Sequence, residues 1–252
     1  MKRISLVLLF VLTLTGVQSV HAQGLRVGDR AWHTVRGGLF LGFNQSLHSG
    51  NVPLLPATDN SYFSDGNGSN FIFGVHGEKA LTRFVVLGLR LTFDQMSGDI
   101  DGRYTEPYRI ADNQGTLWNV VRDHSVAYTL QYLSFGGYGK VYPMSGPGLF
   151  LSGGLGIGAL LKSDFSHSAG VVEPDWASGS QSPEQSGNID DSNDLRYSAS
   201  IGLGYDFFFR YGFITPQVMY EFGLNQVVDA SYADTWKVNN LRAVIDVTFP
   251  IP

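Results

Sequence analysis

The feature that most constrains this sequence is a two-residue alternation of apolar and polar side chains. It is clearest in residues 84–95, FVVLGLRLTFDQ. One face of this segment carries Val85, Leu87, Leu89, Leu91 and Phe93, and the other carries Gly88, Arg90, Thr92 and Asp94. Successive side chains point to opposite faces only when the chain is extended. The segment is therefore predicted to be a β-strand with one face that avoids water and one that accepts charge.

Seven further segments alternate in the same way, which brings the number of predicted strands to eight. They are residues 37–44, 70–81, 126–142, 148–162, 196–210, 213–225 and 240–249. The segment at 126–142 changes parity partway along. We expect a β-bulge near Leu133–Ser134, because one extra residue turns every later side chain to the other face.

The connections between the predicted strands alternate in length. Short connections lie at residues 81–84, 142–148 and 210–213, and long ones at residues 45–69, 97–125, 163–195 and 226–239. Short turns at one end and long loops at the other are typical of outer-membrane barrels, whose apolar rows face lipid. The predicted fold is all-β: an eight-stranded antiparallel up-and-down transmembrane β-barrel with short periplasmic turns and long extracellular loops.

The first 22 residues have the features of an export signal. MKR is basic, ISLVLLFVLTLTGV is apolar, and VHA supplies a small-residue cleavage site, which places the cut between Ala22 and Gln23. The apolar stretch is shorter than the roughly 18 residues that a spanning helix needs. We therefore expect a signal peptide at residues 1–22 and an outer-membrane β-barrel at residues 23–252.

The composition agrees with a barrel in a membrane and speaks against a nucleic-acid partner. Charged residues make up 15% of the chain, whereas a typical soluble domain has about 25%. Loss of Lys2 and Arg3 with the signal peptide leaves 15 basic against 22 acidic residues, a net charge of −7. Such a chain lacks the basic excess of a nucleic-acid binder. It has no cysteine, so neither a disulfide nor a lipid on an N-terminal cysteine is expected.

The polar rows of the predicted strands define the barrel interior and carry nine charged residues. They are Glu78, Arg90, Asp94, Lys162, Asp206, Arg210, Glu221, Arg242 and Asp246. The interior of an eight-stranded barrel is just wide enough for side chains to fill. Because an unpaired buried charge is very costly, we expect these residues to form a charge-paired network and not to line an open channel. On the apolar rows of the seven regular strands the only charge is Lys79.

Aromatic residues gather at the strand ends next to the short connections. They are Phe84, Tyr142, Phe209, Tyr211, Phe213 and Phe249. Membrane proteins place such rings at the two membrane–water interfaces. We therefore expect these six side chains to form an aromatic girdle at the periplasmic interface.

Several of these segments resemble the outer-membrane β-barrel domain family, which includes the transmembrane domain of outer membrane protein A and the PorT-like barrels. They are GLFLGFN, FGVHGEKALTRFVVLGLRL, YLSFGGYGKVYP, GLFLSGGLGIGALL, SIGLGYDFFFRYGFITPQVMYEFGLN and NLRAVIDVTF, within residues 35–249. The resemblance implies insertion into the outer membrane by the barrel-assembly machinery. It carries over no catalytic, cofactor-binding or metal-binding residue, and none is predicted here.

A structural or interaction barrel is the first hypothesis for function, because the long connections offer surface to a partner. Residues 97–125 contain a predicted hairpin that turns at Asn113–Gly115, with Tyr108 and Trp118 as candidate contacts. Residues 163–195 hold seven acidic residues and no basic Lys or Arg. Within them, DDSND at residues 190–194 lacks the glycine and downstream glutamate of a calcium loop. We expect an extracellular or envelope protein as the partner of these two loops.

Other functions remain open at this stage. The barrel could be a small passive porin, a secretion accessory or a lipid-modifying enzyme, for which His76 beside Glu78 would be the candidate base. An interior histidine hydrogen-bonded to a carboxylate is the more common situation. A soluble, lipocalin-like barrel would place Arg90, Asp94, Arg242 and Asp246 on the outside, and the low total charge argues against it.

Overall fold

The computed structural model describes residues 35–49, 65–144, 147–179, 185–189, 192–228 and 236–251. The predicted signal peptide and its cleavage site at Ala22 and Gln23 lie outside the described residues. Among the described residues, no helix is long and apolar enough to cross a membrane.

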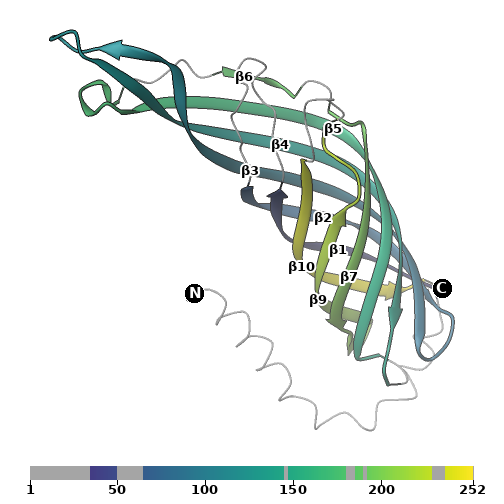
Figure 1. The fold of residues 1–252 in the computed structure, drawn as a ribbon. Coiled ribbons are helices and arrows are strands. Elements are labelled where there is room, and N and C mark those ends of the chain that lie inside the picture. The colour runs from purple at the N-terminus through teal and green to yellow at the C-terminus, as the bar shows by residue number, and fades with distance from the viewer. Residues whose placement is uncertain are drawn as a thin grey trace, which may run out of the picture.

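Eight antiparallel strands form a closed ring (Figure 1). They are β1 (Val35–Ser49), β2 (Asp65–Ala80), β3 (Val85–Ala111), β4 (Leu117–Val141), β5 (Leu149–Glu173), β7 (Leu195–Tyr205), β9 (Gly212–Gly223) and β10 (Lys237–Pro250). Each strand pairs with the next, and β10 pairs with both β9 and β1, which closes the ring. Two short strands, β6 (Gln185–Asn188) and β8 (Phe207–Phe209), add to β5 and β9, and η2 (Asp175–Ala177) follows β5. The predicted eight-stranded barrel is confirmed.

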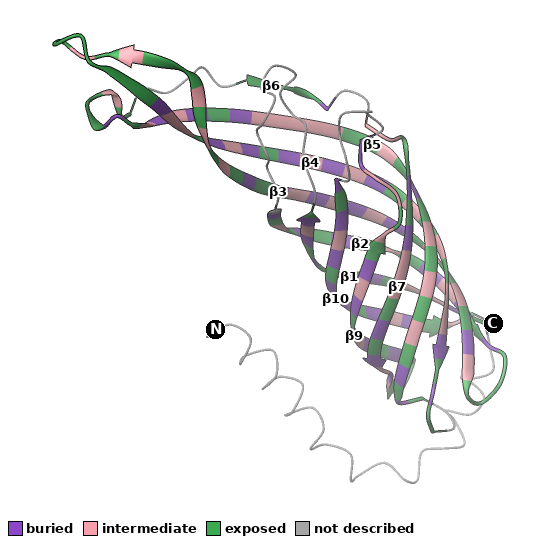
Figure 2. Cartoon of the chain, in the orientation of Figure 1, coloured by how far each residue is buried: buried purple, intermediate pink, exposed green. Residues whose placement is uncertain are grey.

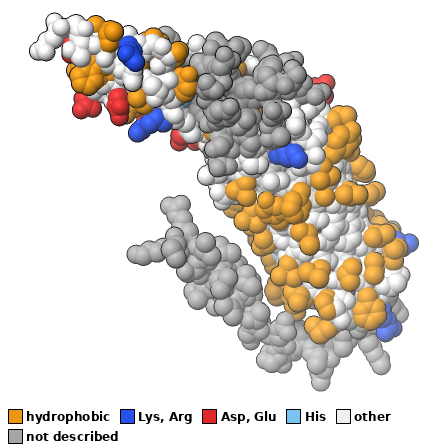
Figure 3. Space-filling view, in the orientation of Figure 1, with side chains coloured by type: hydrophobic (Ala, Val, Ile, Leu, Met, Phe, Trp, Pro, Cys, Tyr) orange, Lys and Arg blue, Asp and Glu red, His pale blue; other side chains and the backbone are white. Residues whose placement is uncertain are grey.

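The alternation in the sequence becomes the inside and the outside of this barrel. On β1 the apolar Leu39, Leu41 and Phe43 are exposed, while Phe40 and Asn44 between them are buried. Figure 2 shows the same banding along the other strands. The exposed apolar side chains lie on all eight strands of the ring and form an apolar belt on the barrel wall, one face of which Figure 3 shows.

The belt has a polar limit at the end of the barrel that carries the long connections, here called the loop end. The outward residues there are Gln45, Ser69, Gln95, Gln131 and Lys162. The opposite end, with the short connections, is the turn end. Polar side chains replace apolar ones at the polar limit, so the residues beyond this limit lie outside the apolar belt.

The apolar residues of β4 near the loop end point inward, where the sequence pattern predicted a bulge. Pairing between β3 and β4 runs without a shift from Val85↔Val141 to Thr105↔Val121. The bulge predicted near Leu133–Ser134 is therefore wrong. The inward side chains belong to an apolar plug at the loop end: Met96, Ile100, Val126, Tyr128, Leu130, Tyr132, Ile189, Val227, Val228, Trp236 and Val238. The interior at this end is apolar, so β4 needs no change of parity.

A parity change that the structure does contain near this level lies in β5. Gln131 pairs with Lys162 and Tyr132 pairs with Leu160, so Leu161 is the extra residue. A strand that alternated without interruption would turn Lys162 and Asp164 inward. The bulge instead leaves Lys162 exposed beside Asp164, with which it forms an ion pair. It also turns His167, Ala169 and Val171 toward the buried side.

Three strands continue well beyond the polar limit. We call residues 98–128 of β3 and β4, together with residues 163–173 of β5, the blade (Figure 1). The 14 residues of β3 in the blade span roughly 45 Å at the usual rise of a strand. The β3–β4 pairing ends at Ala111↔Leu117, so the predicted hairpin with its turn at Asn113–Gly115 is confirmed. Gly115 adopts a φ of 79°, which favours glycine at this turn.

Candidate functional site

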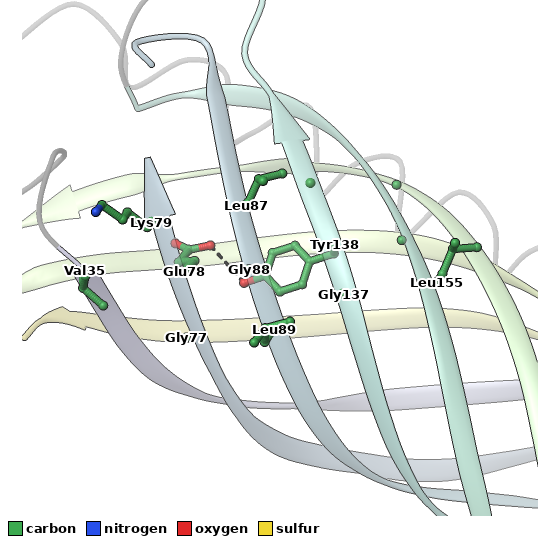
Figure 4. A pocket seen from close by; sticks show the side chains of 13 residues that line it. Val35, Gly77, Glu78, Lys79, Leu87, Gly88, Leu89, Gly137, Tyr138 and Leu155 are labelled. Carbon is green, nitrogen blue, oxygen red and sulfur yellow. Dashed lines mark hydrogen bonds between the residues drawn. The ribbon is translucent and has the colours of Figure 1, made fainter. Parts of the chain in front are cut away.

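A first ionic layer crosses the barrel interior near the turn end. Glu78 on β2 forms an ion pair with each of the two cations of the layer. Its Oε1 lies 2.8 Å from Arg36 Nη2, and its Oε2 lies 2.9 Å from Lys140 Nζ. Tyr138 donates its hydroxyl to Glu78 Oε2 at 3.0 Å, as Figure 4 shows. Lys140 Nζ also lies 3.8 Å from Asp206 Oδ1. These residues come from β1, β2, β4 and the β7–β8 junction, so the layer ties opposite walls together.

A second ionic layer lies next to the apolar plug, on the side of the plug that faces the turn end. Glu221 on β9 receives Arg196 Nη1 at 2.6 Å and Arg242 Nη1 at 2.7 Å, one on each carboxylate oxygen. Arg242 also contacts Asp94 on β3. Asn240 donates its amide to Glu221 Oε1 at 3.1 Å. Each carboxylate therefore faces at least one guanidinium, which offsets part of the cost of burying it.

Arg90 and Asp246 occupy the level between the two layers. The guanidinium of Arg90 lies over the rings of Phe40 and Tyr138, with 4.9 and 4.8 Å from its carbon to the ring centroids. Asp246 on β10 is buried opposite Phe40 on β1. Among the described residues, the interior holds five basic and five acidic side chains: Arg36, Arg90, Lys140, Arg196 and Arg242 with Glu78, Asp94, Asp206, Glu221 and Asp246.

Two of the nine predicted interior charges lie outside. Lys162 is exposed because of the β5 bulge, and Arg210 is exposed in the β8–β9 turn, where it lies over the ring of Tyr211 at 5.3 Å. Three interior cations were missed: Arg36, Lys140 and Arg196. Arg36 precedes the stretch first assigned to a strand, and Lys140 lies in the irregular segment 126–142, which the count of interior charges left out. The alternation of β7 does place Arg196 on the inner row, so its signal was present.

The predicted aromatic girdle is correct only in part. Phe84, Tyr211 and Phe249 are exposed at the turn end and Phe209 is half-buried. Tyr142 and Phe213 are buried instead, in an apolar cluster with Ala80, Val86 and Phe150. They have inward parity, and their rings fill the turn end of the interior next to the first ionic layer. Tyr142 donates its hydroxyl to Asp206 Oδ2 at 2.7 Å, which satisfies its polar end.

The candidate catalytic histidine is part of the packed interior. His76 is buried, and its Nε2 lies 3.2 Å from Thr248 Oγ1. The ring also packs near Phe40 and Tyr138. Within the described parts of the chain, no group of three or more potential metal-ligating side chains occurs. His76 is therefore a packed interior residue, in contact with Thr248, Phe40 and Tyr138.

The tip of the blade presents large side chains in a fixed arrangement. Tyr108, Leu117, Trp118 and Trp176 are exposed. Asp112 organises the turn, since its Oδ1 accepts the backbone N–H groups of Gln114 and Thr116 at 2.8 and 2.9 Å. Its Oδ2 accepts the indole N–H of Trp118 at 3.1 Å. These donors, that of Trp118 first, lower the pKa of Asp112. The tip thus holds an exposed indole in one orientation.

One edge of the blade carries unpaired backbone. The pairing of β2 with β3 ends at Gly66↔Ile100, so within the described residues β3 has no neighbour on that side from Asp101 onward. On the far side of the blade, β6 covers only Asp164 to His167 of β5. An open strand edge offers backbone donors and acceptors to another chain.

Comparison with known proteins identifies the architecture. Residues 21–229 match the family model described as outer membrane protein beta-barrel domain. This chain belongs to that family. It is therefore an integral protein of the outer membrane, its apolar belt lies in the lipid bilayer, its turn end faces the periplasm, and the blade lies outside the cell.

The chain is also similar to solved structures of small outer-membrane barrels. The attachment invasion locus protein Ail of Yersinia pestis is 13% identical, with 86% of this chain and 99% of that chain covered and a TM-score of 0.36. Neisserial surface protein A is 12% identical, with 85% and 97% covered and a TM-score of 0.33. A search of curated proteins finds no match.

An open groove of about 940 Å³ lies in the apolar belt of this outer-membrane protein. Outward-facing Gly77, Gly137, Gly139 and Gly153 leave its floor without side chains, and Leu87 and Leu89 form a ridge within it (Figure 4). The groove is lined mainly by apolar side chains and glycines and faces the bilayer.

Proposed function

We propose that this protein is a non-catalytic anchor that holds the blade in place at the cell surface for a protein partner. The observation that carries the proposal is the contrast between the two parts of the molecule. The barrel interior holds two layers of ion-paired side chains between the apolar clusters at its two ends. The blade, in contrast, extends far beyond the belt, with exposed aromatic side chains and an edge that has no paired strand among the described residues.

The chemistry of the blade tip supports a protein partner. Tryptophan and tyrosine are the residues most enriched at the energetic centres of protein interfaces. Trp118 and Tyr108 are exposed there, and the bond from Trp118 to Asp112 reduces the entropy that the indole would lose on binding. We further propose that the barrel-assembly machinery inserts the chain, as it does for barrels of this kind.

Site-specific photocrosslinking in living cells tests the proposal. A photoreactive amino acid at position 118 should give a discrete adduct with a second protein. The matched control carries the same group at position 144, since Met144 is exposed in the β4–β5 turn at the periplasmic end. Adducts of the same pattern at both positions, or none at position 118, would contradict a blade-specific partner.

Removal of the blade provides the second arm. Arg103 and Asp123 lie opposite each other on β3 and β4, so an Asn-Gly turn can join them in place of residues 104–122. The shortened protein should still form a barrel that migrates differently before and after heating. A barrel that no longer forms would show that the blade belongs to the folding core, contrary to the anchor model.

A further inference from the structure

Two histidines meet at the base of the blade. His124 on β4 pairs with Ala169, and His167 on β5 pairs with Val126, so the two side chains are diagonal neighbours on one face. Both are buried. His124 lies seven residues beyond Gln131, the residue of β4 at the polar limit of the belt, so the pair is outside the membrane.

The two rings share one hydrogen bond. His124 Nδ1 and His167 Nε2 are 3.0 Å apart, and the ring planes differ by 12°. The ring centroids are 5.2 Å apart. That is close to the largest separation that a 3.0 Å contact permits, so both nitrogens lie almost on the line between the rings. One neutral imidazole therefore donates N–H and the other accepts it.

This arrangement tolerates one added proton and not two. The first can enter on a nitrogen that points away from the contact, which keeps the hydrogen bond. The second converts the acceptor into a donor, and two N–H groups then face each other between two positive rings. Such a pair titrates in two macroscopic steps.

The charged groups around the pair offset only part of the repulsion between two protonated rings. From β3, Glu106 Oε1 lies 3.9 Å from His124 Nε2, but it also lies 3.6 Å from Arg122 Nε on β4. Asp123 lies on the other face of β4 and pairs with Arg103 at 2.6 Å. Ala169 of β5 pairs with His124, and Gln185 of β6 pairs with His167. Neither residue carries a charge.

We propose that His124 and His167 form an acid-sensitive contact that holds β5 to β4 at the base of the blade and releases it when both rings are protonated. The proposal deepens the proposed function, since it regulates the surface on which that function rests. Its test needs no partner, so it can fail or succeed independently.

The direction of the pH dependence follows from the burial of the rings. Burial lowers the pKa of His124, with Arg122 acting in the same direction and Glu106 against it. Burial also lowers the pKa of His167, and His124 lowers it further. A histidine whose pKa is lowered by folding stabilises the fold above its unfolded value of about 6.5. That contribution is lost as the pH falls below this value through the folded pKa values.

Nuclear magnetic resonance of the full barrel in lipid nanodiscs, with labelled histidine, follows the pair directly between pH 8 and pH 4. His124 and His167 should titrate in two coupled steps below the ordinary histidine range. Hydrogen exchange, corrected for the intrinsic pH dependence of exchange, should show at least a tenfold loss of protection in residues 166–171 between pH 7 and pH 5. Residues 85–96 of β3 serve as the internal control.

The variant His167→Gln separates the two roles of the side chain. Glutamine can still hydrogen-bond to His124 but does not titrate, so the loss of protection at pH 5 should disappear. Unlinked titration of both histidines at ordinary pKa values, or equal acid sensitivity of His167→Gln and the native protein, would overturn the proposal. If the variant does not fold, the titration of the native protein decides alone.

Discussion

At the scale of single residues, the interior depends on carboxylates that serve several partners at once. Glu78 accepts Arg36, Lys140 and the hydroxyl of Tyr138 within 3.0 Å, and its side chain is almost completely buried. Glu221 plays the same role for Arg196 and Arg242 in the second layer. Because each carboxylate bridges strands that are distant along the chain, its loss affects several walls of the barrel together.

The substitution Glu78→Gln should destabilise the barrel by about 3–5 kcal/mol, because it leaves the buried cations Arg36 and Lys140 with one anion fewer. The free energy of unfolding in urea, measured with the protein in lipid vesicles, checks this value. Asp123→Asn is the matched control: it breaks the exposed pair with Arg103 and should leave the unfolding midpoint in place. Equal effects of the two substitutions would show that the ionic layers contribute no more than a surface pair.

At the scale of elements, glycines in the strands divide by the face on which they lie. A Cβ at Gly88 of β3 would come within 2.4 Å of the Tyr138 ring, which lies across the glycine to reach Glu78. A Cβ at Gly137 of β4 would meet only Leu89 Cδ2, at 3.9 Å, on the lipid side. Inward glycine therefore makes room for a ring, and outward glycine leaves open surface.

Gly88→Ala should cost about 1–3 kcal/mol, because the added methyl group displaces Tyr138 from its bond to Glu78. Gly137→Ala, one strand away and facing outward, should change stability by no more than about 0.5 kcal/mol. Urea unfolding of both variants under the same conditions provides the measurement. If Gly137→Ala were the more damaging of the two, the inward placement of the Tyr138 ring would be wrong.

At the scale of the whole molecule, the barrel is closed along its length and the blade is open to its surroundings. Moving outward from the periplasm, the described interior consists of the Tyr142–Phe150–Phe213 cluster, the first ionic layer, the level of Arg90, the second ionic layer and the apolar plug. The open backbone edge lies on the blade, beyond the bilayer. The surface that we propose for contact with a partner is thus concentrated at one end.

The purified protein should give no steady stepwise current in planar bilayers, because successive packed layers fill the lumen. The double variant Tyr128→Ala, Trp236→Ala thins the plug and should remain closed, since both ionic layers persist below it. Conductance recordings of the two proteins side by side check this. Large stable openings of the native protein would favour the porin hypothesis over the anchor.

The sequence by itself determined the eight strands of the ring, the face that most of them turn to lipid, the short turns and the hairpin at Asn113–Gly115. These are local properties, since period-two alternation and turn residues act within a few positions of the chain. Only the tertiary structure decided which charges meet, where the bulge lies and that the loop end of the interior is apolar. Lys162 was predicted inside but lies outside, because inside and outside beyond a bulge depend on pairing with a neighbouring strand. The histidine pair likewise exists only through the register of β4 against β5, which no single segment encodes.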